Sequence, residues 1–580
     1  MFFDVNVSGG SILSVNHDPA GKTENKQEEP IAGAEGKRKG LFERLRSRST
    51  GVCPEGAVGV ACYDPKVHGP IVNLSWDPVP NVEVVEIYPV NEPFAYVRIL
   101  LDNNTLENTY QILEPAMSDE DLKLAEEVKS GILERLDINM GTVTRADATN
   151  AIEKYTDLIL RDYKIRITPA QHAKLFYYIE REFVGDGKID ALMHDPNIED
   201  ISCDGVNSPL FIFHGKYESL ESNIVYTDPE ELNSFVTKLA QRSGKSLTIS
   251  EPMLDATMPD GSRIQMTLGT SVTAHGSTFT IRKFKDEPVT PTDLMQWSTF
   301  SPLSIAYLWL AVENGKSCIF AGGTASGKTT SLNAIALFIP RMSKIITLED
   351  TRELKLSQPN WIPSVTRDSV SNDGKGEIDM YDLLKGALRQ RPEYLIVGEV
   401  RGKEALTLFQ AMSTGHITYS TMHADSVSSA IHRLENPPIE VPRNMCTALD
   451  IMCIQVQTQV GGKRTRRNKQ IIEILDIDAN TNELITNEVF RWHEATDEIR
   501  YTGKSFVLES IIDKKGWTEA RMTEELKNRQ LVLQWMMEKR IRNYKEVSNV
   551  LISFGRRPEL LMEKVKAELA PPSFDPFESN

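Results

Sequence analysis

The chain has 580 residues, of which 40% are hydrophobic, 25% charged and 7% aromatic, a composition typical of globular proteins with about three or four domains of this size. Its net charge of −17 speaks against wrapping nucleic acid, and its six cysteines are too few for a disulfide framework. No apolar stretch reaches the roughly 18 residues of a membrane span, and the first residues lack the pattern of a signal peptide. We therefore expect a cytoplasmic protein.

Residues 1–75 are rich in Gly, Pro, Asn and Glu and show little periodicity, which predicts a poorly ordered leader. The leader contains the basic segment GKRKGLFERLRSRS. Two interpretations of this segment stay open: a solvated linker, or an element attracted to an anionic membrane surface, where each basic residue contributes roughly 1 kcal/mol. Cys53 and Cys62, with His68 nearby, could supply metal ligands, although free thiols are more common where no CxxC pair occurs.

The next two segments combine strands and helices. The β-rich stretches VEVVEIYPV and FAYVRILLD, followed by the helical SDEDLKLAEEVKSGILERLD, predict a first N-terminal α/β domain over residues 76–165. Residues 166–286 begin with a helix and continue in short strands, and the Asp260-Gly261 pair between apolar runs predicts a hairpin. Two prolines in KDEPVTPTDL indicate a linker at residues 287–292.

Strands and helices alternate from residue 293 to residue 510, which predicts a mainly parallel sheet covered on both faces. The basic run GGKRTRRNK, residues 461–469, lies between two of these strands and is expected to be a solvated hairpin tip. Such a tip could also meet acidic loops of a membrane protein. The last segment, residues 511–580, has the amphipathic pattern of a C-terminal helical extension.

The segment GGTASGKTT fits the pattern GxxxxGK[ST], follows the apolar strand CIFA and begins a helix. Its glycines allow backbone N–H groups to surround phosphates, and the helix N-terminus adds positive potential. The lysine reaches the β- and γ-phosphates, and the threonine hydroxyl binds Mg²⁺. The predicted nucleotide-binding residues are Gly322, Gly323, Thr324, Ala325, Ser326, Gly327, Lys328, Thr329 and Thr330.

Polar residues follow three further strands of the predicted sheet. KIITLED ends on two acids, EYLIVGEV ends on Gly-Glu where Asp-Glu is frequent, and two histidines flank ITYSTM. Because the carboxyl ends of parallel strands open into one crevice, the acids are candidates for binding a metal or preparing a water molecule. A histidine in that crevice could hydrogen-bond the γ-phosphate or a carboxylate. These candidates are Glu349, Asp350, Glu399, Arg401, His416 and His423.

The order GGTASGKTT, ITLEDTREL, EYLIVGEVR and STGHITYSTMHADS resembles the secretion-ATPase superfamily of type II and type IV secretion, pilus and archaellum motors. The resemblance spans residues 166–510, and HADS and IYPVNEPFAYVRI are most similar to its archaeal branch. It implies a RecA-like motor domain over residues 293–510. It also implies a PAS-like α+β domain over residues 166–286, because DPNIEDISCDG, MPDGSRIQM and STFTIRKF resemble that domain.

The resemblance also implies a role for each matching position. Glu349 and Asp350 would serve the metal and the attacking water, and Glu399 would position that water, so the implied metal-site residues are Thr329, Glu349, Asp350 and Glu399. His423, and with it His416, would contact the γ-phosphate side, and Arg401 would lie at the nucleotide. Arg263 and Arg282 resemble the arginines with which the preceding domain closes on the nucleotide at a subunit boundary.

The function implied by this resemblance is a homohexameric motor that hydrolyses ATP with Mg²⁺. It would dock on a polytopic membrane platform protein at the inner face of the cell membrane and assemble or rotate an archaellum or type IV pilus-like filament. An archaeal protein-secretion ATPase is the alternative, and a nucleic-acid translocating motor is a rival from another class. The acidic balance speaks against that rival, so we expect no nucleic-acid partner. A nucleotide kinase would share only the phosphate loop, and a non-hydrolysing switch would not need both Glu349 and Glu399.

Overall fold

The computed structural model describes residues 63–135, 144–284, 287–367 and 376–569. The basic segment, Cys53 and Cys62 lie outside the described residues. The described residues divide into two compact units, the first within residues 63–77, 91–97, 113–135 and 144–185 and the second within residues 78–90, 98–112, 186–284, 287–367 and 376–569. Within the described residues, no helix combines the length and the apolar character that a membrane crossing requires.

The first unit is a small helical bundle. Thr168 caps one helix by accepting the N–H of Gln171, whose side chain in turn accepts the N–H of Thr168. Apolar residues spaced three or four apart place Val128, Ile132 and Ile152 in a shared core. The helices of this unit are α2 (Pro65–His68), α3 (Asp119–Arg135), α4 (Arg145–Asp162) and α5 (Pro169–Phe183).

The first sheet of the second unit has nine strands among the described residues, in the order β1-β2-β3-β6-β5-β4-β9-β8-β7, with the ends of β1 to β3 assigned to the first unit. The expected turn at Asp260-Gly261 joins β7 to β8, and Gly261 has the positive φ of 93° that favours glycine there. The strands are β1 (Val82–Asn91), β2 (Ala95–Asp102), β3 (Glu107–Leu113), β4 (Ile198–Cys203), β5 (Pro209–His214), β6 (Glu218–Val225), β7 (Met253–Thr257), β8 (Arg263–Thr267) and β9 (Thr278–Arg282). The helices of this region are η1 (Gly187–Ile189), α6 (Asp190–His194) and α7 (Pro229–Arg242).

The second sheet has nine strands in the described part of the chain, in the order β12-β11-β13-β14-β10-β15-β16-β17-β18. Neighbours from β12 to β15 are parallel, and β15 to β18 are antiparallel. The strands are β10 (Cys318–Gly322), β11 (Ile345–Glu349), β12 (Trp361–Val365), β13 (Tyr394–Val397), β14 (Ile417–Met422), β15 (Ile451–Val460), β16 (Lys463–Ile477), β17 (Leu484–His493) and β18 (Glu498–Tyr501). This is the mixed α/β arrangement that the alternation of strands and helices predicts, and it agrees with the RecA-like motor domain that the resemblance implies.

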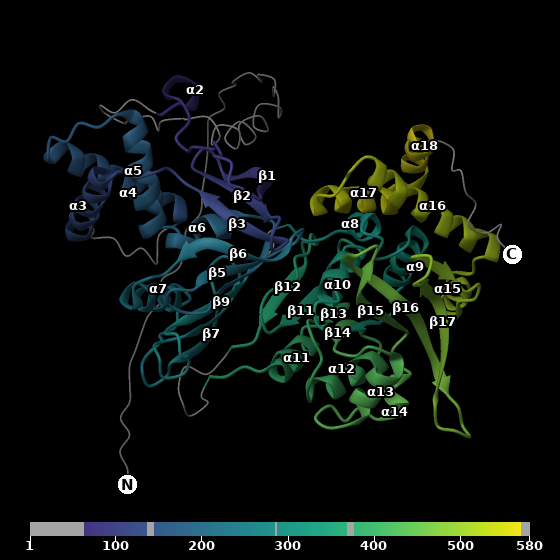
Figure 1. Cartoon of the computed structure of the whole chain (residues 1–580). Coiled ribbons are helices and arrows are strands. Elements are labelled where there is room, and N and C mark those ends of the chain that lie inside the picture. Colours follow the sequence, from purple (N-terminus) through teal and green to yellow (C-terminus); the bar gives the residue numbers. More distant parts are fainter. Residues whose placement is uncertain (1–62, 136–143, 285–286, 368–375, 570–580) are drawn as a thin grey trace, which may run out of the picture. The chain divides into compact units, whose positions relative to one another are not determined.

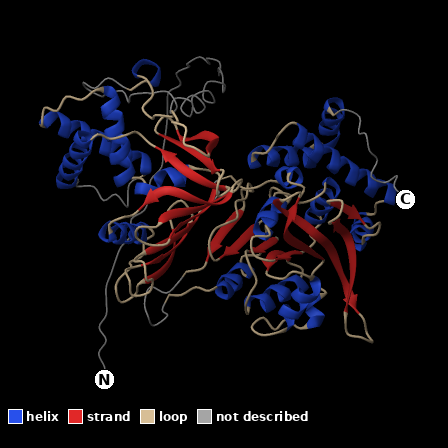
Figure 2. Cartoon of the chain, viewed as in Figure 1, coloured by secondary structure: helices blue, strands red, loops and turns tan. Residues whose placement is uncertain are grey.

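Helices cover both faces of the second sheet, and each face has its own apolar core (Figures 1 and 2). Strands β10, β11 and β13 are buried along their whole length, which explains their mainly apolar sequences. The helices are α8 (Pro291–Gln296), α9 (Pro302–Glu313), α10 (Lys328–Ala336), α11 (Met380–Leu388), α12 (Glu404–Ser413), α13 (Val427–Glu435), α14 (Arg443–Cys446), α15 (Phe506–Lys515), α16 (Glu519–Glu538), α17 (Tyr544–Arg556) and α18 (Pro558–Glu568).

The basic run at residues 461–469 differs from the expected hairpin tip. Only Gly461 and Gly462, with φ of 58° and 78°, form the turn, and the basic residues belong to β16. Two consecutive glycines with positive φ make the tight turn that matches the twist of paired strands. As a result the side chains of the run alternate between the two faces of the sheet.

Candidate active site

A pocket of about 530 Å³ lies in the second unit, at the carboxyl ends of the parallel strands β10, β11, β13 and β14. Parallel strands present their carboxyl ends at the same edge of a sheet, so the segments that follow them meet there. The candidates that line the pocket are Arg263, Arg282, Thr324, Ala325, Ser326, Gly327, Lys328, Thr329, Thr330, Glu349, Asp350, Glu399, Arg401 and His423. The structure therefore brings together most of the residues that the sequence singled out.

The phosphate loop begins in close contact with the neighbouring strand. A Cβ at Gly322 would lie 2.5 Å from the carbonyl oxygen of Gln455 and 2.5 Å from Oγ of Ser326, so only glycine fits. Further along, Ala325 and Gly327 have φ of 58° and 86°. Left-handed residues that alternate with ordinary ones turn successive N–H groups inward and form an anion-binding concavity. Helix α10 starts directly behind it and adds positive potential.

Lys328 is the first residue of α10 and is only 8% exposed. Its Nζ donates a hydrogen bond to the carbonyl oxygen of Gly323 at 2.8 Å. Burial lowers the pKa of this amine, while the negative charge of Glu399 acts in the opposite direction. An anion bound in the loop would replace the carbonyl as partner of the ammonium group and favour its charged form.

Glu349 ends β11 and is 2% exposed. Its Oε1 accepts the backbone N–H groups of Glu353 at 2.8 Å and Leu354 at 2.9 Å, whereas Oε2 has no hydrogen-bond partner among the described residues. Burial raises the pKa of this carboxyl to about 7. A half-satisfied buried carboxyl in a pocket has one oxygen free to bind a water molecule or a metal-bound ligand.

Gly398 explains the departure from Asp-Glu at the end of β13. A Cβ there would lie 3.3 Å from Cγ of Glu349, closer than most side-chain contacts. An aspartate at this position would therefore press on the buried glutamate and place a second carboxylate beside it. Because glycine has no Cβ, the side chain of Glu349 can occupy the space beside residue 398.

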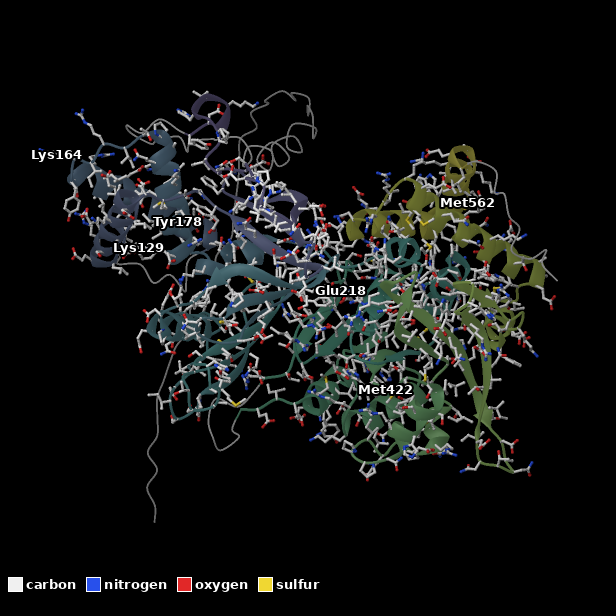
Figure 3. All side chains as sticks on the ribbon, in the orientation of Figure 1. Lys129, Lys164, Tyr178, Glu218, Met422 and Met562 are labelled. Atoms are coloured by element: carbon white, nitrogen blue, oxygen red, sulfur yellow. The ribbon has the colours of Figure 1, made fainter. Side chains whose placement is uncertain are left out.

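Glu399 and His423 form the second polar pair of the pocket, with 3.1 Å between Oε1 of Glu399 and Nε2 of His423. They follow β13 and β14, and Met422, the last residue of β14, is labelled in Figure 3. Burial lowers the pKa of His423, and the positive charge of Lys328 lowers it further. The negative charge of Glu399 acts in the opposite direction, but the net effect is a lowered pKa that disfavours the charged imidazolium form of His423.

Asp350 and Arg401 are paired with each other. Nη2 of Arg401 donates to Oδ2 of Asp350 at 2.6 Å, and Thr366 lies 3.3 Å from the other carboxylate oxygen. Both residues line the pocket. Their ion pair, however, engages the carboxylate that was predicted to serve the metal and the guanidinium that was predicted to lie at the nucleotide. No group of three or more His, Cys, Asp or Glu side chains that could hold a metal ion occurs within the described ranges.

Arg263 and Arg282 come from the first sheet and are direct register partners on β8 and β9. Nη2 of Arg263 lies 3.0 Å from Oε1 of Glu353, the residue whose N–H binds Glu349. Both arginines line the pocket that contains Lys328 of the same chain. The structure thus places both arginines at the same pocket as the phosphate loop of their own chain.

His416 is not among the described residues that line the pocket. It precedes β14, whereas His423 follows that strand, so a strand of six residues separates the two histidines. Nδ1 of His416 lies 3.3 Å from Oγ1 of Thr414. A histidine at the amino end of a parallel strand lies at the opposite edge of the sheet from the phosphate loop, which argues against the predicted contact.

Two arginines of the basic run, Arg464 and Arg466, line the pocket, which the sequence analysis did not predict. Nε of Arg466 donates to the carbonyl oxygen of Ala325 at 2.9 Å. A signal was available in the sequence, because Gly461-Gly462 is a two-residue turn signature. A two-residue turn puts Arg464 and Arg466 on the strand that follows, two positions apart and therefore on one face of it.

Comparison with known proteins gives two family matches. Residues 185–538 match the family described as type II/IV secretion system protein, and residues 41–116 match a PilB3-like N-terminal family. An uncharacterized protein of Methanocaldococcus jannaschii is 36% identical over 500 residues, which cover 82% of this chain and 89% of that protein. The probable conjugal transfer protein TrbB of Sinorhizobium fredii is 31% identical over 40% of this chain and 69% of its own length.

Among solved structures, the VirB11 ATPase from the type IV secretion system of Brucella suis is similar over 48% of this chain and 89% of its own, with 24% identity and a TM-score of 0.25. The family match at residues 185–538 covers more than half of the chain and includes every pocket residue named above. The archaeal relative extends the likeness over most of the remaining sequence. The chain therefore belongs to the type II/IV secretion system family and is an ATPase of its archaeal branch.

Proposed function

We propose that this ATPase is a motor that hydrolyses Mg·ATP to assemble a filament of type IV pilin-like subunits. One observation carries the proposal: a phosphate loop, a half-satisfied buried carboxyl and a Glu–His pair, contributed by four parallel strands, line one pocket. Phosphoryl transfer requires positioning and charge stabilisation more than covalent chemistry, and these groups supply both.

The residues fit a nucleoside triphosphate with its metal. The inward-turned N–H groups of the loop and the buried amine of Lys328 match the phosphates, and Oε2 of Glu349 lacks a partner within the described ranges. Thr329 would hold Mg²⁺, with Glu349 and Glu399 nearby. The ion would neutralise charge on the phosphate oxygens.

The chain's own groups would act in the following way. Lys328 leaves the carbonyl of Gly323 and binds the phosphates. Glu349 and Glu399 orient the attacking water, and His423 takes up or returns a proton within its pair with Glu399. Arg263 and Arg282 stabilise the negative charge of the transition state from the side of the first sheet. Because they lie on a separate sheet, hydrolysis becomes sensitive to the approach of that sheet.

Membership of the type II/IV secretion system family suggests which proteins this chain assembles with. We infer a homohexamer that docks on a polytopic membrane platform protein at the cytoplasmic face of the membrane. The match of residues 41–116 to a PilB3-like N-terminal family supports a pilus more than an archaellum. The likeness to TrbB keeps transport by a secretion or conjugation system as the alternative, since that protein is named for conjugal transfer.

The first test is Lys328→Ala. Removing the amine should abolish phosphate release from ATP and weaken binding of a fluorescent ATP analogue at least about tenfold, since a charge-assisted contact contributes about 1.5–3 kcal/mol. Lys515→Ala, in the exposed last turn of α15, is the matched control. Full turnover by the Lys328 variant would contradict the site.

In cells the same variant should remove surface pili, and loss of swimming with pili intact would instead favour the archaellum.

A further inference from the structure

Arg466 touches the phosphate loop from the side opposite the catalytic acids. Its Nε donates to the carbonyl oxygen of Ala325 at 2.9 Å. Its aliphatic part lies over Gly327, where a Cβ would come within 3.2 Å of Cδ of Arg466. One side chain from β16 therefore supports two residues of the loop.

These two loop residues have the backbone conformations on which phosphate binding depends. Ala325 has φ of 58° and Gly327 has φ of 86°. Alanine in the left-handed region is unfavourable by about 1–2 kcal/mol, so this conformation needs support from its surroundings. The hydrogen bond from Arg466 fixes the orientation of the peptide group that follows Ala325, and thereby the N–H group of Ser326.

We propose that Arg466 is a positioning residue for nucleotide binding, which holds the phosphate loop in its anion-binding conformation through the carbonyl of Ala325. The inference rests on the proposed function, because it takes this loop as the phosphate site. Arg466 acts on the nucleotide through the loop, and its Nη2 remains 3.8 Å from Oε2 of Glu199 on β4. The same side chain thus links the loop to the first sheet.

The geometry separates a positioning effect from a charge effect. In glutamine, the amide Nε2 is the same number of bonds from the backbone as Nε of arginine. Arg466→Gln therefore keeps a donor for the carbonyl of Ala325 and removes the positive charge. Arg466→Ala removes both. The matched control is Arg491→Ala, which removes an exposed arginine of β17 that is ion-paired with Glu488 and does not line the pocket.

The experiment measures the affinity of the full chain for fluorescent ATP and ADP analogues, the KM and kcat of ATP hydrolysis, and the thermal unfolding temperature. Arg466→Ala should weaken both analogues by about tenfold and raise KM by a similar factor, with kcat at saturation within about twofold, because the lost contact preorganises binding. Arg466→Gln should retain affinity within about threefold of the wild-type chain.

The affinities of the Ala and Gln variants, compared with each other, decide between loop position and charge. Equal weakening by Ala and Gln would show that charge rather than loop position matters and would overturn the proposal. Unchanged affinity in the Ala variant would overturn it as well. If Ala prevents folding, the Gln variant alone decides, because a tenfold loss there contradicts the positioning role. Failure of the wild-type chain and of Arg491→Ala to bind either analogue would instead refute the proposed function.

Discussion

Glu349 is the residue whose chemistry depends most on its surroundings. Its pKa is raised from 4.5 to about 7 by burial, so the carboxyl holds its proton in acid and loses it near neutrality. If the carboxylate orients the attacking water, kcat/KM of ATP hydrolysis should rise with pH around a midpoint of about 7. Glu349→Gln should lose this dependence together with most of the activity. A profile that is flat between pH 5.5 and 8.5 in the wild-type chain would assign the role elsewhere.

The raised pKa of Glu349 also makes the stability of the fold depend on pH. A carboxyl whose pKa is higher in the folded state favours folding below its unfolded value of 4.5 and loses that contribution as the pH rises to about 7. The wild-type chain should therefore lose about 1–3 kcal/mol of unfolding free energy relative to Glu349→Gln between pH 4.5 and 8. Denaturant unfolding of both proteins at the two pH values, without nucleotide, measures this difference. The same measurement is a control for the activity profile, because only the buried carboxyl, and not the nucleotide, can titrate in it.

Glu399 is distinguished from Glu349 by its partner. It pairs with His423 at 3.1 Å, is only partly buried and lines the pocket, so its carboxylate is accessible to a water molecule there. Glu399→Gln should bind ATP normally and reduce turnover about a hundredfold or more, as expected for loss of a group that positions or deprotonates water. Single-turnover hydrolysis and retention of radiolabelled ATP measure the two effects. Normal turnover would leave Glu349 as the group that activates the water.

At the scale of the elements, the junction of β10 with the phosphate loop depends on close packing. A Cβ at Gly322 would lie 2.5 Å from a backbone oxygen of β15, whereas no heavy atom of the described residues lies within 4 Å of a Cβ at Gly323. Gly322→Ala should therefore destabilise the chain by roughly 1–3 kcal/mol and weaken nucleotide binding. Gly323→Ala should change the unfolding free energy by less than about 0.5 kcal/mol. Equal destabilisation by the two variants would contradict the packing argument.

The sequence predicts the strands beside the pocket best, because β10, β11 and β13 are short and mainly apolar runs that polar residues follow, whereas it predicts a hairpin tip at the basic start of β16. Glu349, Glu399 and His423 could be assigned to one crevice for that reason alone. The long-range pairing could not be predicted. Strands β3 and β6 pair in parallel although more than a hundred residues separate Thr109 from its partner Glu221, and no local pattern encodes that contact.

The site itself was predictable only in part. Patterns of residue type place a carboxyl at the end of β11, but its burial and the free oxygen of Glu349 depend on the packing of neighbouring strands. The pairing of Asp350 with Arg401 likewise needs three-dimensional distances. His416 shows the opposite case, because it precedes β14 in the chain, and the order of residues in a parallel sheet already places it at the edge away from the phosphate loop. The domain boundaries assigned from the sequence stay predictions.

At the scale of the whole molecule, the arginines of the first sheet could act within one subunit or between subunits of the proposed ring, and the two arrangements predict different kinetics. The sequence suggested a subunit boundary, but Arg263 lines the pocket of its own chain and pairs with Glu353 at 3.0 Å. In that arrangement Arg263 and Lys328 serve the same nucleotide. Arg263→Ala should then lower kcat, by up to about a thousandfold for a complete arginine finger, while nucleotide binding persists.

Co-expression of two differently tagged variants, Arg263→Ala and Lys328→Ala, separates the two arrangements in the proposed hexamer. If Arg263 acts within its own subunit, every site in the mixed ring lacks one of the two groups, and the purified mixture should hydrolyse ATP no faster than the average of the two variants alone. If Arg263 acts across the boundary, some sites combine an intact Lys328 with an intact Arg263 of the neighbour, and activity returns. The contacts of Arg263 predict no recovery, and a recovery of a quarter or more of wild-type turnover would show that these contacts are exchanged between subunits when the ring forms.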